Sequence, residues 1–211
     1  MSIQTLDTNS IAQPDWDVPP IAEEQVYRAG AYHTLAALLR DVPQVDVLNQ
    51  ISALAEIQTR NDELGLAMSM LGLAARDRSL SQIDDEFHNL FIGLGRGELV
   101  PYASWYLTGF LMEKPLALLR DDLMALGFER TPSTFEPEDH VAALCEVMAM
   151  LISENQPMQT QTEFFQSHLA NWVDRFYADL SQARQAVFYR AVGRFGAAFF
   201  ELERDYLAMK V

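Results

Sequence analysis

Apolar residues recur at helical spacing along nearly the whole chain from Ile21 onward, and this periodicity restricts the fold more than any other feature of the sequence. One stripe falls at positions i, i+3, i+7, i+10, i+11 and i+14 and consists of Leu80, Ile83, Phe87, Leu90, Phe91 and Leu94. Such spacing gives a helix one apolar side. No alternating apolar run bounded by turn residues indicates a strand. We therefore expect an all-α fold, a single globular helical bundle of roughly eight to ten helices.

Breaks in the periodicity divide the chain into segments. Ser79 and Gln82 match a capping box at the start of one helix, and the bounds expected for other helices are about 23–40, 44–59, 62–76 and 115–126. Residues 1–20 contain three prolines and scattered aspartates, so we expect a flexible N-terminal arm before one helical domain at 21–211. Residues 127–137 are the expected hinge, which would permit either a monomer or a swapped dimer.

The composition indicates a soluble, cytoplasmic protein. Of 211 residues, 49% are hydrophobic, and the single cysteine, Cys145, excludes an internal disulfide and fits a reducing compartment. The longest uncharged stretches, residues 99–112 and 64–75, are shorter than the ~18 residues that cross a bilayer. The N-terminus also lacks the basic and apolar regions of a secretory signal.

The chain is strongly acidic, with 30 Asp and Glu residues against 15 Lys and Arg and a net charge of −15. This charge repels phosphate backbones and anionic lipid surfaces, so we expect neither nucleic-acid binding nor stable membrane insertion. Seven acids and no Lys or Arg lie between Arg130 and Arg175. Such a zone either keeps the protein soluble or binds a cationic partner.

Motifs for catalysis or cofactor binding are absent from the sequence. It contains no HExxH, no GxSxG, no phosphate-binding Gly-Lys-Ser/Thr loop and no Glu-x-x-His pair for a di-metal centre. We therefore expect no cofactor and no metal site.

The most informative polar cluster is Glu136-Pro137-Glu138-Asp139-His140. Pro137 suits the first position of a helix, where its missing N–H is not needed, and carboxylates in the first turn complement the helix dipole. On that interpretation the cluster is simply a helix start. Alternatively, the cluster flanks a groove, since Asp139 and Glu146 would lie two turns apart on one polar face while His140 borders the apolar stripe.

An aromatic cluster and a histidine each have both a structural and a functional interpretation. Tyr102, Trp105 and Tyr106 lie close together in the chain and either fill the interior or form a recognition patch. His168 lies among apolar neighbours and is expected to be a hydrogen-bonded core histidine.

Three stretches resemble, in order and spacing, the TorD/DmsD family of cytoplasmic chaperones for molybdenum-containing redox enzymes. They are residues 86–95 leading to 101–106, then 136–140, then 168–172. The resemblance covers about residues 21–208 and implies a TorD-like all-α fold without catalysis of a metabolic reaction. It also implies binding of a client enzyme, often through its twin-arginine signal peptide, before cofactor insertion and export. The implied client is an apo-molybdoenzyme of the DMSO/TMAO reductase or formate dehydrogenase type. The client-binding residues that the resemblance implies are Glu136, Pro137, Asp139, His140, Tyr102, Ser104, Trp105 and Tyr106.

A twin-arginine leader offers two guanidinium groups followed by an apolar segment, and an acid-lined apolar groove between helices would complement it. We expect Asp139, together with Glu136 or Glu138, to bind an arginine. The aromatic residues Tyr102 and Trp105 and neighbouring Leu or Met side chains would then cover the apolar part. His140 would orient the acid or sense protonation.

Two alternatives are still open from the sequence. In an enzyme, Asp139 and His140 could act as an acid–base pair, although adjacent residues of a helix point about 100° apart. A helical regulatory or scaffolding protein could instead bind some other partner through the same acidic groove.

Overall fold

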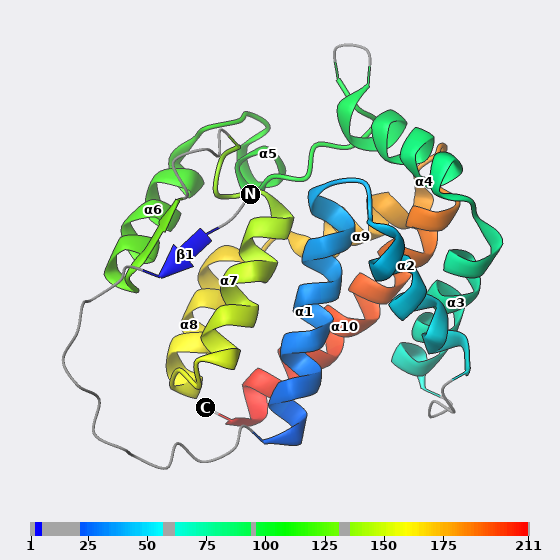
Figure 1. The fold of residues 1–211 in the computed structure, drawn as a ribbon. Coiled ribbons are helices and arrows are strands. Elements are labelled where there is room, and N and C mark those ends of the chain that lie inside the picture. The colour runs from blue at the N-terminus through cyan, green and yellow to red at the C-terminus, as the bar shows by residue number, and fades with distance from the viewer. Residues whose placement is uncertain (1–2, 6–21, 57–61, 94–95, 131–135, 211) are drawn as a thin grey trace.

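The helices expected from the periodicity are formed in the computed structural model, which describes residues 3–5, 22–56, 62–93, 96–130 and 136–210 (Figure 1). The α-helices are α1 (Glu23–Arg40), α2 (Val45–Ser52), α3 (Glu63–Asp77), α4 (Leu80–Phe87), α5 (Ala103–Thr108), α6 (Lys114–Ala125), α7 (Val141–Ser153), α8 (Met158–His168), α9 (Val173–Gln182) and α10 (Phe188–Lys210). A short 3-10 helix, η1 (Ala53–Glu56), follows α2, and a π-helical segment, η2 (His88–Ile92), follows α4. The all-α fold class is confirmed.

Helix α7 lies within the bundle and is the most deeply buried helix described. Ten of its 13 residues are buried, because it packs against both α1 and α8. The longest helix, α10, packs mainly against α9 and α3 (Figure 1). Burial among several helices explains why the sequence of α7 is apolar on nearly every side.

The helix lengths do not indicate a membrane span. Helix α10 is 23 residues long, but charged residues such as Arg190, Arg194 and Glu201 interrupt it. Within the described residues, no helix is both long enough and apolar enough to cross a bilayer.

Two three-residue strands depart from the expectation that no strand forms. Strand β1 (Ile3–Thr5) pairs antiparallel with β2 (Phe128–Arg130), beside α6 in Figure 1. Three residues are too few to show alternation, and the partner lies far away in the chain, so local periodicity does not reveal the pair. The start of the expected N-terminal arm thus contains a paired strand, and residues 6–20 lie outside the described part. The expected hinge begins with the turn and strand at 127–130, and residues 131–135 are likewise outside it.

Helix α7 begins later than expected. The expectation that Pro137 occupies the first helical position is wrong, because the helix starts at Val141. Residues 136–140 lie outside the helix, and the N–H of His140 donates a 3.3 Å hydrogen bond to the carbonyl of Pro137. Asp139 therefore lies before the helix rather than on its polar face.

His140 caps α7 with its imidazole ring. Its Nδ1 accepts a 3.2 Å hydrogen bond from the N–H of Ala142, which satisfies one of the donors left free at a helix start. Burial lowers the pKa of His140 from 6.5 to about 4, although the Glu136 carboxylate acts in the opposite direction. The ring is therefore neutral at neutral pH and acts as a hydrogen-bond acceptor, which does not fit a sensor of protonation near pH 7.

Glu86, within the first motif stretch, caps the start of α10. Its carboxylate accepts hydrogen bonds from the N–H groups of Val187 at 2.7 Å, Phe188 at 3.1 Å and Tyr189 at 2.7 Å. These donors have no helical carbonyl to bind, and a negative charge complements the helix dipole at this end. Glu86 thereby joins α4 to α10 through buried, charge-assisted bonds.

Replacing Glu86 should therefore destabilise the fold. We expect Glu86→Ala to lower the free energy of unfolding by about 2–4 kcal/mol, because three backbone donors lose their acceptor at once. Asp85→Ala removes the same charge from an exposed position of the same helix and should change it by less than about 0.5 kcal/mol. Urea unfolding measures both variants, and equal midpoints would contradict the capping role.

The buried His140 should make stability depend on pH. The pKa of His140 in the folded protein lies below 6.5, the ordinary pKa of a histidine in an unfolded chain. The unfolded chain therefore binds the proton first as the pH falls. The stability that this group contributes is complete above about pH 6.5 and is lost towards pH 4.

Asparagine accepts the same cap hydrogen bond without titrating. His140→Asn should therefore lose less stability than the wild type between pH 6.5 and pH 4, by up to about 3 kcal/mol. Urea unfolding at a series of pH values measures this difference. The matched control is His33→Asn at an exposed position of α1. An unaltered pH profile for His140→Asn would rule out the buried neutral cap.

Candidate functional site

Two motif segments that are far apart in the chain lie side by side. Tyr102 and His140 form an isolated antiparallel bridge, and their rings meet edge to face with centroids 5.0 Å apart. The N–H that follows each of them donates a 2.9 Å hydrogen bond to a carbonyl of the opposite segment. We call residues 101–104 and 136–141 the paired segments.

Asp139 is buried at this junction with one carboxylate oxygen unpaired. Its exposed fraction is 1%. Its Oδ2 accepts a 2.8 Å hydrogen bond from the N–H of Ser104, whereas its Oδ1 has no hydrogen-bond partner among the described residues. Leaving a buried acceptor without a donor is costly. Oδ1 of Asp139 is thus a buried acceptor without a donor among the described residues.

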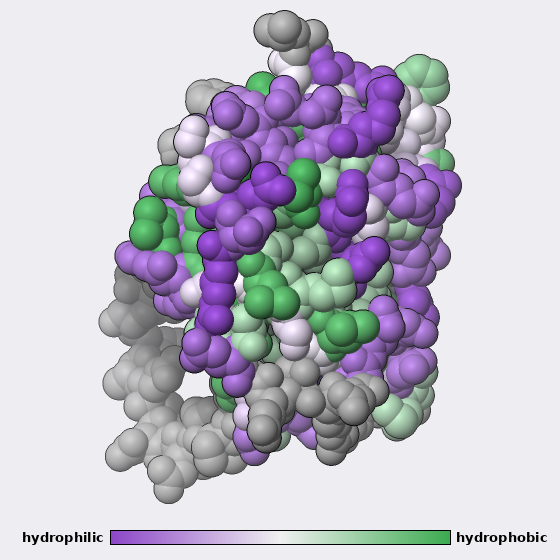
Figure 2. Space-filling model, turned by 90° about the vertical axis from the view of Figure 1, so that its right-hand side faces the viewer, coloured by the Kyte–Doolittle hydropathy of each residue, from purple (hydrophilic) through white to green (hydrophobic). Residues whose placement is uncertain are grey.

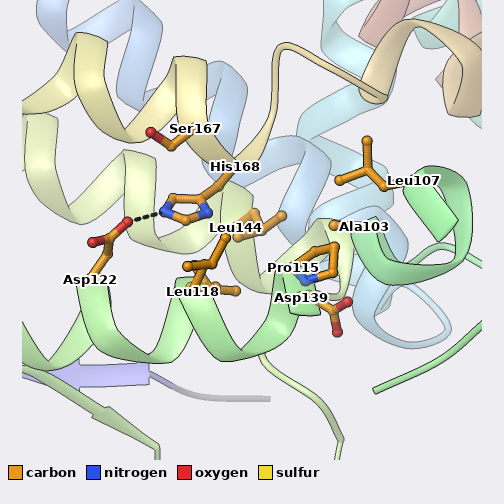
Figure 3. Close-up of a pocket in the computed structure, with 10 residues that line it drawn as sticks. Ala103, Leu107, Pro115, Leu118, Asp122, Asp139, Leu144, Ser167 and His168 are labelled. Atoms are coloured by element: carbon orange, nitrogen blue, oxygen red, sulfur yellow. Dashed lines mark hydrogen bonds and ion pairs between the residues drawn. The ribbon is translucent and has the colours of Figure 1, made fainter. Parts of the chain in front are cut away.

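A cavity of about 230 Å³ adjoins Asp139, between α5, α6, α7 and α8 (Figure 3). Its polar lining consists of Asp139, Asp122, Ser167 and His168. The apolar lining residues are Ala103, Leu107, Pro115, Leu118, Leu119 and Leu144. The cavity thus combines mainly apolar walls with two carboxylates, a combination that suits a ligand with an apolar body and cationic groups.

His168 and Asp122 are bonded to each other in this cavity. The 2.7 Å bond joins Nε2 of His168 on α8 to Oδ2 of Asp122 on α6, as the dashed line in Figure 3 shows. Burial lowers the pKa of His168 against the opposing effect of the Asp122 carboxylate. The carbonyl of His168 also accepts a 2.7 Å hydrogen bond from the indole of Trp172. His168 is thus the hydrogen-bonded core histidine that the sequence predicts, and it also lines the cavity.

The other acids of the cluster already bind side chains of this chain. Glu138 accepts hydrogen bonds of 2.8 and 3.0 Å from the guanidinium of Arg120 on α6. Glu136 accepts a 2.5 Å hydrogen bond from the hydroxyl of Tyr102, and both burial and this bond raise the pKa of that tyrosine. Neither acid lines the cavity. Of the three carboxylates expected to bind an arginine, the structure places only Asp139 there.

The aromatic residues Tyr102, Trp105 and Tyr106 do not line the cavity either. The guanidinium of Arg96 lies 4.5 Å from the centroid of the Trp105 ring. The hydroxyl of Tyr106 donates a 3.0 Å hydrogen bond to Asp179 on α9. Tyr102 is held within the paired segments. These contacts give Tyr102 and Tyr106 a structural role, and the leucines of α5, α6 and α7 supply the apolar lining instead.

Sequence reasoning missed Asp122. Helix α6 contributes Pro115, Leu118, Leu119 and Asp122 to the cavity, which are positions i, i+3, i+4 and i+7 of one helix face. A carboxylate that continues an apolar stripe is the signal that could have identified it. Its adjacent acid, Asp121, is exposed and does not line the cavity.

Exposed apolar side chains continue from the cavity to the surface. They belong to the α5–α6 connection and its flanking helices and are 44–72% exposed. We call this set the apolar rim; its members are Leu107, Phe110, Leu111, Met112 and Leu118. Leu107 and Leu118 also line the cavity, so the rim and the cavity form one apolar surface.

A larger hollow of about 920 Å³ lies between α1, α3 and α10. Figure 2 shows apolar side chains gathered among hydrophilic ones on the side of the molecule that carries α3. The buried charges of this hollow are Arg28 and Glu203, which bond to each other at 2.6 and 2.8 Å through both carboxylate oxygens. It therefore offers no buried carboxylate oxygen without a partner, as far as the described residues show, and the smaller cavity is the better site for a cation.

Comparisons with known proteins agree with the fold and the motifs. Residues 54–178, which include every residue lining the cavity, match the family model described as "Nitrate reductase delta subunit". The chain is 31% identical over 175 residues to "Chaperone protein TorD" of Vibrio cholerae serotype O1 (strain M66-2), covering 77% of this chain and 79% of that protein. It is 25% identical over 187 residues to "Chaperone protein TorD" of Actinobacillus pleuropneumoniae serotype 7 (strain AP76), covering 85% and 94%.

A solved structure shares the fold. A crystal structure from Archaeoglobus fulgidus, described as that of a redox enzyme maturation protein, superposes with a TM-score of 0.57 at 16% identity. The match covers 89% of this chain and 99% of that one. The family model, over residues 54–178, covers all three motif stretches. The chain belongs to the nitrate reductase delta subunit family, the TorD-like chaperones that its motifs resemble.

Proposed function

We propose that this chaperone binds the twin-arginine signal peptide of an immature molybdenum-containing oxidoreductase in the cytoplasm, before cofactor insertion and export. The client would be an apoenzyme of the DMSO/TMAO reductase or formate dehydrogenase type, as expected for this family. The observation that carries the proposal is the unpaired, buried Oδ1 of Asp139 beside an apolar cavity.

A guanidinium group suits this position. It carries five N–H donors and a permanent positive charge, so it can satisfy Oδ1 and neutralise the buried carboxylate together. A charge-assisted hydrogen bond of this kind stabilises a complex by about 1.5–3 kcal/mol. Lysine offers a compact, strongly hydrated ammonium instead, which loses more hydration on entering an apolar cavity. The site should therefore prefer arginine to lysine.

The apolar rim would bind the apolar segment that follows the arginines in such a leader. Burying apolar surface contributes about 25 cal/mol per Å². Part of this gain is offset by ordering a flexible peptide. Two arginine contacts and a modest apolar contact should together give micromolar or somewhat tighter binding.

The surrounding charge favours the approach of a cationic peptide. The net charge of −15 gives a long-range attraction that raises the association rate and falls with salt. This attraction does not distinguish arginine from lysine, so it contributes to rate more than to selectivity.

The enzymatic alternative is not favoured by the geometry. Nδ1 of His140 accepts the helix-cap bond, and Oδ2 of Asp139 accepts the bond from Ser104, so the two side chains are not joined to each other. His140 also does not line the cavity. The scaffolding alternative predicts binding through charge alone, which the choice of peptide can test.

Replacing Asp139 tests the proposal directly. Asp139→Asn keeps a carbonyl oxygen for the Ser104 bond but removes the charge, so we expect leader-peptide affinity to fall at least tenfold with little change in the unfolding midpoint. Isothermal titration calorimetry with a synthetic twin-arginine leader measures the affinity. Asp85→Asn removes one charge from an exposed position of α4 and should leave affinity within about twofold.

A second peptide separates recognition from charge attraction. The same leader with both arginines replaced by lysines should bind at least tenfold more weakly to the wild type. Equal binding of the two peptides would favour a generic acidic scaffold. A destabilised Asp139→Asn protein that still binds the leader would show that Asp139 is structural.

The apolar rim yields an independent expectation. Leu111→Ser should weaken binding of a leader that contains its apolar segment by about threefold to tenfold, because Leu111 is 47% exposed and available to a ligand. It should not affect a shortened peptide that ends after the arginines. The control is Leu73→Ser, which replaces a leucine on α3 that is 58% exposed, and this variant should bind both peptides normally. Loss of both peptides in Leu111→Ser would argue against the rim as the apolar subsite.

A further inference from the structure

The cavity contains a second carboxylate, at the opposite end from Asp139. Figure 3 shows Asp122 and Asp139 on opposite sides of Leu118 and Leu144. Helix α6 runs along the cavity from Pro115, beside Asp139, to Asp122, seven residues later. At 1.5 Å per helical residue, this part of the wall is about 10 Å long.

We propose that the cavity binds both guanidinium groups of the twin-arginine motif at once, one at Asp139 and the other at Asp122. This inference rests on the proposed function and extends it by assigning a separate carboxylate to each arginine. It also explains why a pair of arginines would be recognised rather than a single cationic residue.

The geometry of an extended peptide matches two separated carboxylates. Successive side chains of an extended chain point to opposite sides, so two adjacent arginines reach in opposite directions. Their aliphatic stems can lie along Leu118 and Leu144 while the charged ends contact the two acids. A single carboxylate would leave one of the two guanidinium groups without a partner inside the apolar cavity, which is unfavourable.

Asp122 is held in a position that suits this role. Its Oδ2 is bonded to Nε2 of His168, which is itself anchored by the bond from Trp172 to its carbonyl. Restricting the side chain in this way lowers the entropy that a ligand must remove on binding.

The two positions should differ in strength. Asp139 is 1% exposed, whereas the side chain of Asp122 is 55% exposed. Water screens the charge of Asp122 more, so an ion pair there is weaker. We therefore expect the ion pair at Asp139 to contribute more to the affinity than the ion pair at Asp122.

The test uses three leader peptides and three variants of the full chain. The peptides contain Arg-Arg, Gln-Arg or Arg-Gln at the motif, and the variants are Asp139→Asn, Asp122→Asn and Asp121→Asn. Asp121 is the matched control, because it is exposed on the same helix and does not line the cavity. Fluorescence anisotropy measures the affinity, and urea unfolding checks that each variant is folded.

Two results are expected. For the Arg-Arg peptide, Asp122→Asn should lower affinity by about threefold to tenfold, and Asp121→Asn should leave it within about twofold. The single-arginine peptides should show opposite patterns. Asp122→Asn should not further weaken the peptide that lacks the arginine bound at Asp122. Asp139→Asn should not further weaken the peptide that lacks the arginine bound at Asp139.

The outcomes distinguish this inference from the proposed function. If Asp122→Asn affects no peptide, or weakens all three equally, while Asp139→Asn weakens Arg-Arg binding, the assignment of Asp122 is wrong and the proposed function stands. If neither variant changes the affinity for any peptide, the proposed function itself fails. A purely structural role of Asp122 would weaken all three peptides equally and would not produce opposite patterns for the two single-arginine peptides. The Asn side chain also keeps an acceptor for His168.

Discussion

Backbone pairing between residues 101–104 and 136–141 is the constraint on which the site depends. Buried N–H and C=O groups must find partners, and each paired segment supplies partners for the other. This pairing brings the turn before α7 against the start of α5, where the N–H of Ser104 binds one oxygen of Asp139. The other oxygen has no partner among the described residues, and Asp139 lines a cavity between four helices. Without the pairing, Asp139 would be an ordinary exposed acid of a surface turn.

Features of the fold that depend on neighbouring residues could be predicted from the sequence. Helix α1 has its expected bounds, and the capping box of Ser79 and Gln82 is present at the start of α4. Gly127 adopts a positive φ of 79° directly after the helix expected at 115–126. Each of these depends on periodicity, capping or backbone freedom within a few residues. For the same reason the all-α class followed from the apolar stripes alone.

Features that depend on contacts distant in the chain could not be predicted in this way. Proline followed by acids is a good local signal for a helix start, yet α7 begins at Val141 because pairing with residues 101–104 holds the preceding turn out of the helix. The chain also supplies internal partners for Glu136 and Glu138, which no local pattern indicates. Asp122 was missed because no local pattern shows that α6 shares a cavity with α7 and α8. The sequence motif therefore includes one residue that lines the cavity, Asp139, but it does not reveal the internal partners of Glu136 and Glu138 or the position of Asp122.

The net charge of the protein and the hydrogen bonding of Asp139 would act differently on a cationic ligand. Many acids contribute to the net charge of −15, and they attract any cation to a similar extent. Of the acids in the 136–140 cluster, two are bonded to Arg120 and Tyr102 and do not line the cavity. Asp139 differs because folding has removed its Oδ1 from water without supplying a donor. Burial of an incompletely bonded carboxylate lowers stability, and a local rule broken in this way is typical of a functional position. A ligand that supplied the missing donors would recover that free energy, so under the proposed function selectivity for a planar, multidentate cation would arise from the buried oxygen rather than from the surface charge.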